Sequence, residues 1–139
     1  MGDNAQVKAA GCTFHSNRAG NYGTFTVFGA ARLNVSHCSF SNNIAQFGSA
    51  VTCGVRSKVL VTHSKFFSSQ ARTGGVLYTF GSGSLEVNGS SFASNKATAG
   101  GVLLTDESSR ATLYGCLLDD NTAASLGGVL SARAYSQVG

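Results

Sequence analysis

The tetrapeptide GGVL occurs three times in this chain, at residues 74–77, 100–103 and 127–130. The first two copies begin 26 residues apart, and an earlier glycine, Gly48, precedes Gly74 by the same interval. The third copy comes one residue late, which indicates a single-residue insertion in the last repeat. Because glycine reaches positive φ without steric cost, each glycine pair is expected to mark a sharp corner of the chain.

Two other columns of residues recur at the same interval of 26. The bulky apolar column consists of Phe14, Phe40, Phe66, Phe92 and Leu118. The asparagine column follows three residues behind it and consists of Asn17, Asn43, Asn95 and Asn121, with Ser69 in the third repeat. Columns that keep their register over five repeats indicate units that stack, because a short repeat cannot bury its apolar face alone.

The two columns have different expected roles. The bulky column is expected to form one continuous stack in the interior, and the asparagine amides to hydrogen-bond from repeat to repeat as a ladder. Ser69 interrupts this ladder and is expected to weaken the third repeat locally.

The stretches between these columns alternate apolar and polar residues, as at Leu33 and Val35 or at Leu85 and Val87. A period of two is typical of strands with one buried face, and the glycine pairs would break a helix. The sequence therefore predicts an all-β protein, a right-handed parallel β-helix (β-solenoid) of about five 26-residue coils. Unequal turns favour a three-sided cross-section, with coils about 4.8 Å apart.

Length and composition limit how many domains the chain can contain. Residues 1–139 are expected to form a single β-helix domain that is a segment of a longer repeat protein. No apolar run is long enough to span a bilayer as a helix, and the first residues lack the order of a signal peptide. Val7 and Val138 fall in the same column, and neither end carries a polar cap, so self-association through the ends is expected.

The four cysteines match no zinc-binding spacing. Cys12, Cys38 and Cys116 share a column with two serines, which indicates small buried residues rather than ligands. Cys12 and Cys38 are one coil apart and within disulfide range, although parallel side chains strain such a bridge, so both redox states stay open. His37 and His63 share a column without a third ligand, and neither a metal site nor a cofactor is expected.

The acidic residues argue against catalysis. The chain has only six, and Asp119 and Asp120 are adjacent, so in a strand they would face opposite sides without acidic partners one coil away. Asp106 and Glu107 are expected in a solvated turn. The carbohydrate-active β-helices need clustered carboxylates, and the chain is therefore expected not to be an enzyme.

The basic residues indicate a binding surface. Arg32, Lys58 and Arg110 share a column interrupted by Ser84, and Arg56 lies nearby. This basic stripe, together with a net charge of +4, would suit an anionic polysaccharide. A merely solvated turn is the alternative. No aromatic residues interleave with the stripe, so nucleic acid is not an expected partner.

The motif pair FxxN and GGxx resembles the repeats of the polymorphic outer membrane proteins (Pmp) of chlamydial autotransporters. The first motif reads FHSN at 14–17, FSNN at 40–43 and FASN at 92–95, with FFSS at 66–69 and LDDN at 118–121. The second is GGVL, with valine where that family usually has alanine. The resemblance implies a right-handed β-helix passenger in a surface-exposed, often adhesive protein that binds a cell-surface receptor.

Two functions follow as expectations. The first is a non-catalytic structural or adhesive β-helix module of a secreted or surface-exposed protein, located outside the cell or at its surface. The alternative is a small carbohydrate-binding or carbohydrate-active β-helix that acts on an acidic polysaccharide.

Overall fold

The computed structural model describes residues 4–133 and 136–139. Parallel strands form four sheets, which we call A to D. Sheet A contains β1 (Gln6–Ala10), β4 (Arg32–Ser36), β8 (Lys58–Thr62), β12 (Ser84–Asn88), β16 (Arg110–Tyr114) and β20 (Gln137–Val138). Sheet B contains β2 (Thr13–His15), β5 (Ser39–Ser41), β9 (Lys65–Phe67), β13 (Ser91–Ala93) and β17 (Leu117–Asp119).

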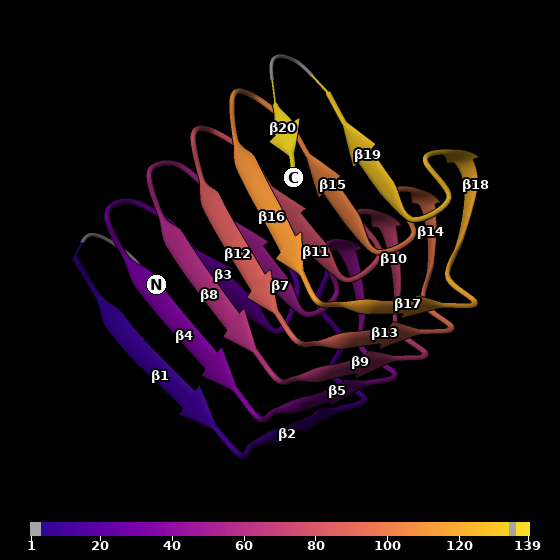
Figure 1. Cartoon of the computed structure of the whole chain (residues 1–139), viewed down its shortest axis with the longest axis horizontal. Helices are drawn as coiled ribbons and strands as arrows, with labels where there is room; N and C mark the ends of the chain where they lie inside the picture. The colour runs from indigo at the N-terminus through magenta and orange to yellow at the C-terminus, as the bar shows by residue number, and fades with distance from the viewer. Residues whose placement is uncertain (1–3, 134–135) are drawn as a thin grey trace.

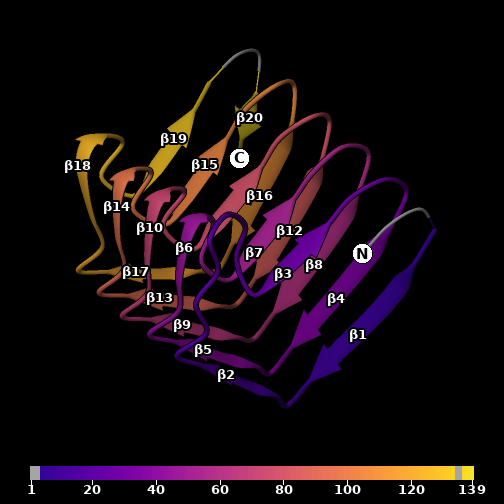
Figure 2. The same ribbon diagram turned by 180° about the vertical axis from the view of Figure 1, so that it is seen from behind.

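The other two sheets complete each coil. Sheet C contains β6 (Ile44–Phe47), β10 (Gln70–Thr73), β14 (Lys96–Ala99) and β18 (Thr122–Leu126). Sheet D contains β3 (Phe25–Val27), β7 (Val51–Cys53), β11 (Leu77–Thr79), β15 (Leu103–Thr105) and β19 (Leu130–Ala132). Figure 1 shows the strands of sheet A side by side in front with sheet B along the lower edge, and Figure 2 shows sheets C and D from behind.

The register confirms the predicted stack of coils. Leu33 pairs with Val59 and Val35 with Val61, each one repeat apart. In the last coil, Ala97 still pairs with Ala123, but Ala99 pairs with Leu126 across a bulge. The inserted residue that delays the third GGVL is therefore absorbed inside β18.

The prediction of three sides was wrong, because four sheets surround the interior. The additional corner lies between sheets A and B, where Gly11, His37, His63, Gly89 and Gly115 all have positive φ. Two coils have histidine rather than glycine at this corner, and non-glycine residues adopt positive φ only at a cost in free energy. The residue types in this column therefore did not indicate a corner. The strands that follow are only three residues long, so the chain turns again almost at once.

The bulky column lines the interior. The rings of Phe40, Phe66 and Phe92 are fully buried, and consecutive centroids lie 4.8 and 4.7 Å apart in stacked geometry. Phe14 stacks on Phe40 at 4.7 Å and is partly exposed. Leu118 is in register with Phe92 but is 37% exposed, because no described coil covers it. The expectation of a fully internal column was therefore wrong at this position.

The two glycines of each pair have different roles. The first glycine, at positions 74, 100 and 127, has positive φ and makes the corner between sheets C and D, as does the single Gly48 in an earlier coil. The second glycine is needed for close packing between coils. A Cβ atom at Gly75 would collide with the carbonyl oxygen of Gly101. The motif therefore recurs because one glycine supplies the turn and the other supplies space.

The asparagine column forms a ladder between sheets B and C. The amide of Asn17 donates to Asn43 Oδ1 at 3.0 Å, and that of Asn95 donates to Asn121 Oδ1 at 2.9 Å. At Ser69 the chain of bonds continues differently: its hydroxyl oxygen accepts the backbone N–H of Asn43 at 3.2 Å. Ser69 therefore keeps one side-chain hydrogen bond to the preceding coil, but it cannot make the hydrogen bonds that an asparagine amide would donate.

Candidate anion-binding surfaces

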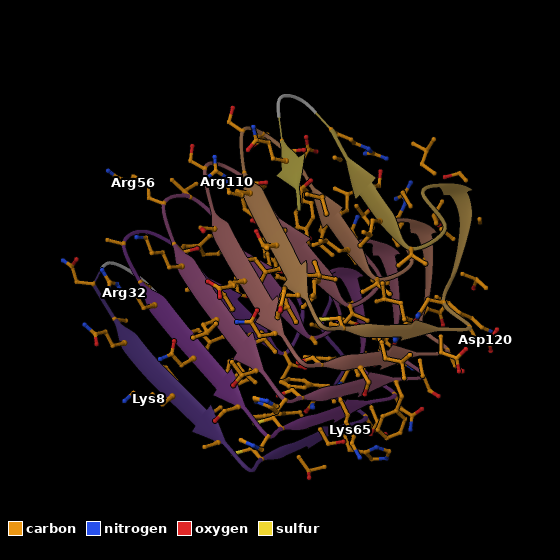
Figure 3. The ribbon with its side chains drawn as sticks, in the orientation of Figure 1. Lys8, Arg32, Arg56, Lys65, Arg110 and Asp120 are labelled. Atoms are coloured by element: carbon orange, nitrogen blue, oxygen red, sulfur yellow. The ribbon has the colours of Figure 1, made fainter. Side chains whose placement is uncertain are left out.

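The basic stripe lies on strands rather than in a turn. Arg32, Lys58, Ser84 and Arg110 begin β4, β8, β12 and β16 and are neighbours in register. All four are exposed. Only Arg56 lies in a turn, between β7 and β8. Figure 3 shows Arg32, Arg56 and Arg110 spread along the upper ends of the sheet A strands. The solvated-turn interpretation is therefore wrong for the three strand residues.

A carboxylate lies beside this stripe. A hollow of about 220 Å³ on sheet A is lined by Arg32 and Lys58 and also by Glu86. Glu86 accepts a hydrogen bond of 2.8 Å from the amide of Asn88. Its negative charge offsets part of the attraction that the stripe would exert on an anion.

The other described acidic residues form two adjacent pairs, Asp106 with Glu107 in a turn and Asp119 with Asp120 at the end of β17. Asp106 Oδ1 accepts the backbone N–H of Glu107 at 2.9 Å, as in a solvated turn. Asp120 accepts the hydroxyl of Ser94 at 3.3 Å, one coil away. Among the described residues, no group of three or more His, Cys, Asp and Glu side chains could hold a metal ion.

His37 and His63 lie as a stacked pair. Their rings are 5.2 Å apart and nearly parallel, at 12°, and both are exposed. Parallel stacking points corresponding nitrogens in the same direction rather than toward one shared point, which does not suit chelation.

All four cysteines are free. Cys12 and Cys38 are linked only by a contact of 3.4 Å between the Cys12 backbone nitrogen and the Cys38 sulfur. Cys38 and Cys53 are buried, whereas Cys12 and Cys116 are partly exposed. Burial raises the pKa of the Cys53 thiol, which opposes formation of a thiolate there.

The structure also places five aromatic rings together outside the core, which sequence reasoning missed. This aromatic cluster consists of Tyr22, Phe28, Phe47, Tyr78 and Phe80, with ring centroids 5.2 to 6.1 Å apart. Gly54 lies between Phe28 and Phe80 in their column, and a Cβ there would collide with the Phe28 ring. A glycine flanked by phenylalanines one repeat away on each side was the available sequence signal.

The aromatic cluster covers the outside of sheet D. Thr52 is fully buried there and donates its hydroxyl to the Phe47 carbonyl at 3.3 Å. Burial, reinforced by the nearby Asp106 and Glu107 carboxylates, raises the pKa of Tyr78 to about 12. The rings pack mainly against one another, so their first role is to hold sheets C and D together.

These features define a class of protein, a parallel β-solenoid with an apolar interior. A family model described as a right handed beta helix region matches residues 1–123. The chain therefore belongs to this family, which also establishes the predicted hand of the coils. No curated protein and no solved structure matched the chain. No helix among the described residues is long and apolar enough to cross a membrane.

Proposed function

We propose that this chain is a non-catalytic adhesive or structural β-helix module of a secreted or surface-exposed protein. The observation that carries this proposal is the register of the coils, which presents equivalent side chains on the outer faces at intervals of about 4.8 Å. Such faces suit repetitive ligands. The resemblance of the FxxN and GGxx motifs to chlamydial Pmp repeats supports a location at the cell surface and binding to a surface receptor.

The contacts of the carboxylates support a role without catalysis. The Asp106 carboxylate accepts the backbone N–H of Glu107, and the Asp120 carboxylate accepts the hydroxyl of Ser94 one coil away. A glycosidase of the usual kind needs two carboxyl groups on opposite sides of one sugar bond. A carbohydrate-active β-helix is the competing function.

One experiment separates these functions. The purified chain is incubated with a panel of acidic polysaccharides, and both retention of the protein and formation of new reducing or unsaturated ends are measured. We expect salt-dependent retention without depolymerisation. Depolymerisation that scales with protein concentration would contradict the non-catalytic role, and a protein retained by neither polysaccharide nor cell surfaces would contradict adhesion.

Association through the end coils belongs to the same proposal. Leu118 and Leu130 continue the buried columns of Phe92 and Leu103 into the last described coil, where they are 37% and 36% exposed. Apolar ladder residues and open strand edges favour contact with further coils, from a second copy or from neighbouring repeats. Light scattering over a concentration series tests this: mass should rise with concentration, and a constant monomer mass would contradict self-association.

A further inference from the structure

The outer face of sheet C carries a long hollow lined by charged and polar side chains. Its volume is about 450 Å³, similar to the hollow of about 460 Å³ beside Arg110 on sheet A and larger than the one of about 220 Å³ beside Arg32 and Lys58. Residues from β6, β10, β14 and β18 line it. The hollow therefore crosses four successive coils, or about 14 Å along the stack. We call it the sheet C trough.

Two rows of side chains form the walls of the trough. Gln70 and Lys96 are paired in register and form one row, while Arg72 and Thr98 lie two residues further along their strands and form the other. All four are exposed. Between the rows is a column of alanines, of which Ala71 is 5% exposed. Because alternate strand residues point to opposite faces, these alanines point inward and the floor between the two rows is strand backbone.

Neighbouring hollows extend the trough. One of about 280 Å³ shares Gln70 and Lys96 with it and adds Ser68 and Ser94 from the turn beside the asparagine ladder. Another of about 210 Å³ shares Ile44 and adds Arg18 and Asn17 from the first coil. The polar surface thus continues from the first coil to the last along the stack axis.

The lining of the trough carries positive charge. The Arg72 guanidinium and the Lys96 ammonium have no hydrogen bond or ion pair within the described part of the chain. No carboxylate lines the trough. Asp120 lies at its margin and accepts a hydrogen bond from Ser94. On sheet A, the hollow beside Arg32 and Lys58 contains Glu86, whereas the hollow beside Arg110 has one cation and no acidic side chain among its described lining residues.

We propose that the sheet C trough binds a linear anionic polysaccharide that lies along the stack axis. This inference rests on the proposed adhesive function and names its ligand and its surface. Arg72 and Lys96 would bind carboxylate or sulfate groups, Arg72 in bidentate geometry. The Gln70 amide and the hydroxyls of Thr98 and Ser68 would bind sugar hydroxyls. No aromatic ring lines the trough, so it lacks the stacking platform that single-stranded nucleic acid requires.

The test compares two variants of equal charge. Arg72→Ser with Lys96→Ser removes two cations from the trough, and Arg32→Ser with Lys58→Ser removes two from the basic stripe. Affinity for heparin is measured by titration calorimetry at two salt concentrations, and circular dichroism establishes that both variants are folded. We expect the trough variant to lose affinity by roughly tenfold or more and to show a shallower salt dependence, with only a small loss in the stripe variant.

A third variant tests recognition of the sugar without altering charge. Gln70→Ala should weaken heparin binding severalfold and leave the salt dependence unchanged. An equal loss of heparin affinity in both charge variants would contradict a binding site in the trough and would indicate diffuse electrostatic attraction. A loss of affinity confined to the stripe variant would place the binding site on sheet A. If single-stranded DNA bound as tightly as heparin and the trough variant lost this binding, the proposal that the ligand is a polysaccharide would be contradicted.

The outcome also separates this inference from the proposed function. Retention on cell surfaces that heparin does not compete, and that the trough variant preserves, would refute the trough while leaving adhesion in place. Cleavage of heparin during the titration would refute the non-catalytic role itself.

Discussion

The side chain of Asn95 holds three successive coils together, and Asn121 is its partner above. The Nδ2 group of Asn95 donates to Asn121 Oδ1 at 2.9 Å and to the Phe66 carbonyl at 3.0 Å. Its own Oδ1 accepts the backbone N–H of Ser69 at 3.0 Å. The ladder thus satisfies the N–H of Ser69 in the turn and adds a bond to the carbonyl of Phe66 in β9, inside the stack, where an unpaired group is costly.

Removing this side chain should destabilise the fold. Asn95→Ala leaves the buried Ser69 N–H and Phe66 carbonyl without their side-chain partners, and we expect a loss of about 1–3 kcal/mol in unfolding free energy. Urea unfolding measures it, with Asn17→Ala in the more exposed first coil as the control. Ser69→Asn should have the opposite effect, a gain of about 0.5–1.5 kcal/mol, because it restores the missing amide. A destabilised Ser69→Asn variant would show that the third coil cannot accept the ladder.

The phenylalanine stack should respond according to position. Phe66→Ala creates a cavity between two fully buried rings, and the expected loss is about 3–5 kcal/mol. Leu118→Ala should cost markedly less, because Leu118 is 37% exposed. Thermal and urea unfolding of both variants compare the two positions. Equal losses at both would indicate that the last coil is covered in solution, as self-association predicts.

The second glycine of GGVL should be needed only where another coil lies against it. Gly75→Ala brings a Cβ against the Gly101 carbonyl oxygen, and we expect about 1–3 kcal/mol of destabilisation. Gly128 occupies the equivalent position in the last described coil, and a Cβ there meets no described atom within 4 Å. Gly128→Ala should therefore be tolerated. A large loss at Gly128 would mean that another coil packs there.

Alkaline pH should weaken the fold through Tyr78. Its pKa is raised to about 12 from an ordinary 10, so between these values the folded state retains a phenol proton that the unfolded chain releases. This contribution to unfolding free energy is complete below about pH 10 and is lost as pH rises toward 12. Tyr78→Phe keeps the ring and should make unfolding less sensitive to pH in that window. Identical pH profiles for the two proteins would argue against a protected phenol.

Much of this architecture could be predicted because the β-helix repeats every interaction once per coil. Phe40, Phe66 and Phe92 are 26 residues apart because they occupy equivalent positions, and the pattern reports stacking without any long-range information. The same holds for the asparagine ladder and for the register of Arg32 and Lys58. The fourth side escaped prediction because His37 and His63 occupy a corner that glycine fills in other coils, so residue type did not reveal the backbone conformation.

The sequence by itself determined which residues lie above one another: the hand of chain crossovers and the 26-residue period leave one way to align the columns. Only the tertiary structure decided which columns from different sheets face a common space. Arg72 and Lys96 belong to different columns, and their cooperation depends on how the strands of sheet C place the two columns beside one hollow. Glu86 beside Lys58 is likewise a neighbour across the strand surface. The repeat period in the sequence directly gives the residues that stack along the axis. Which columns lie side by side on a surface depends on where each coil bends, and the period does not give those positions.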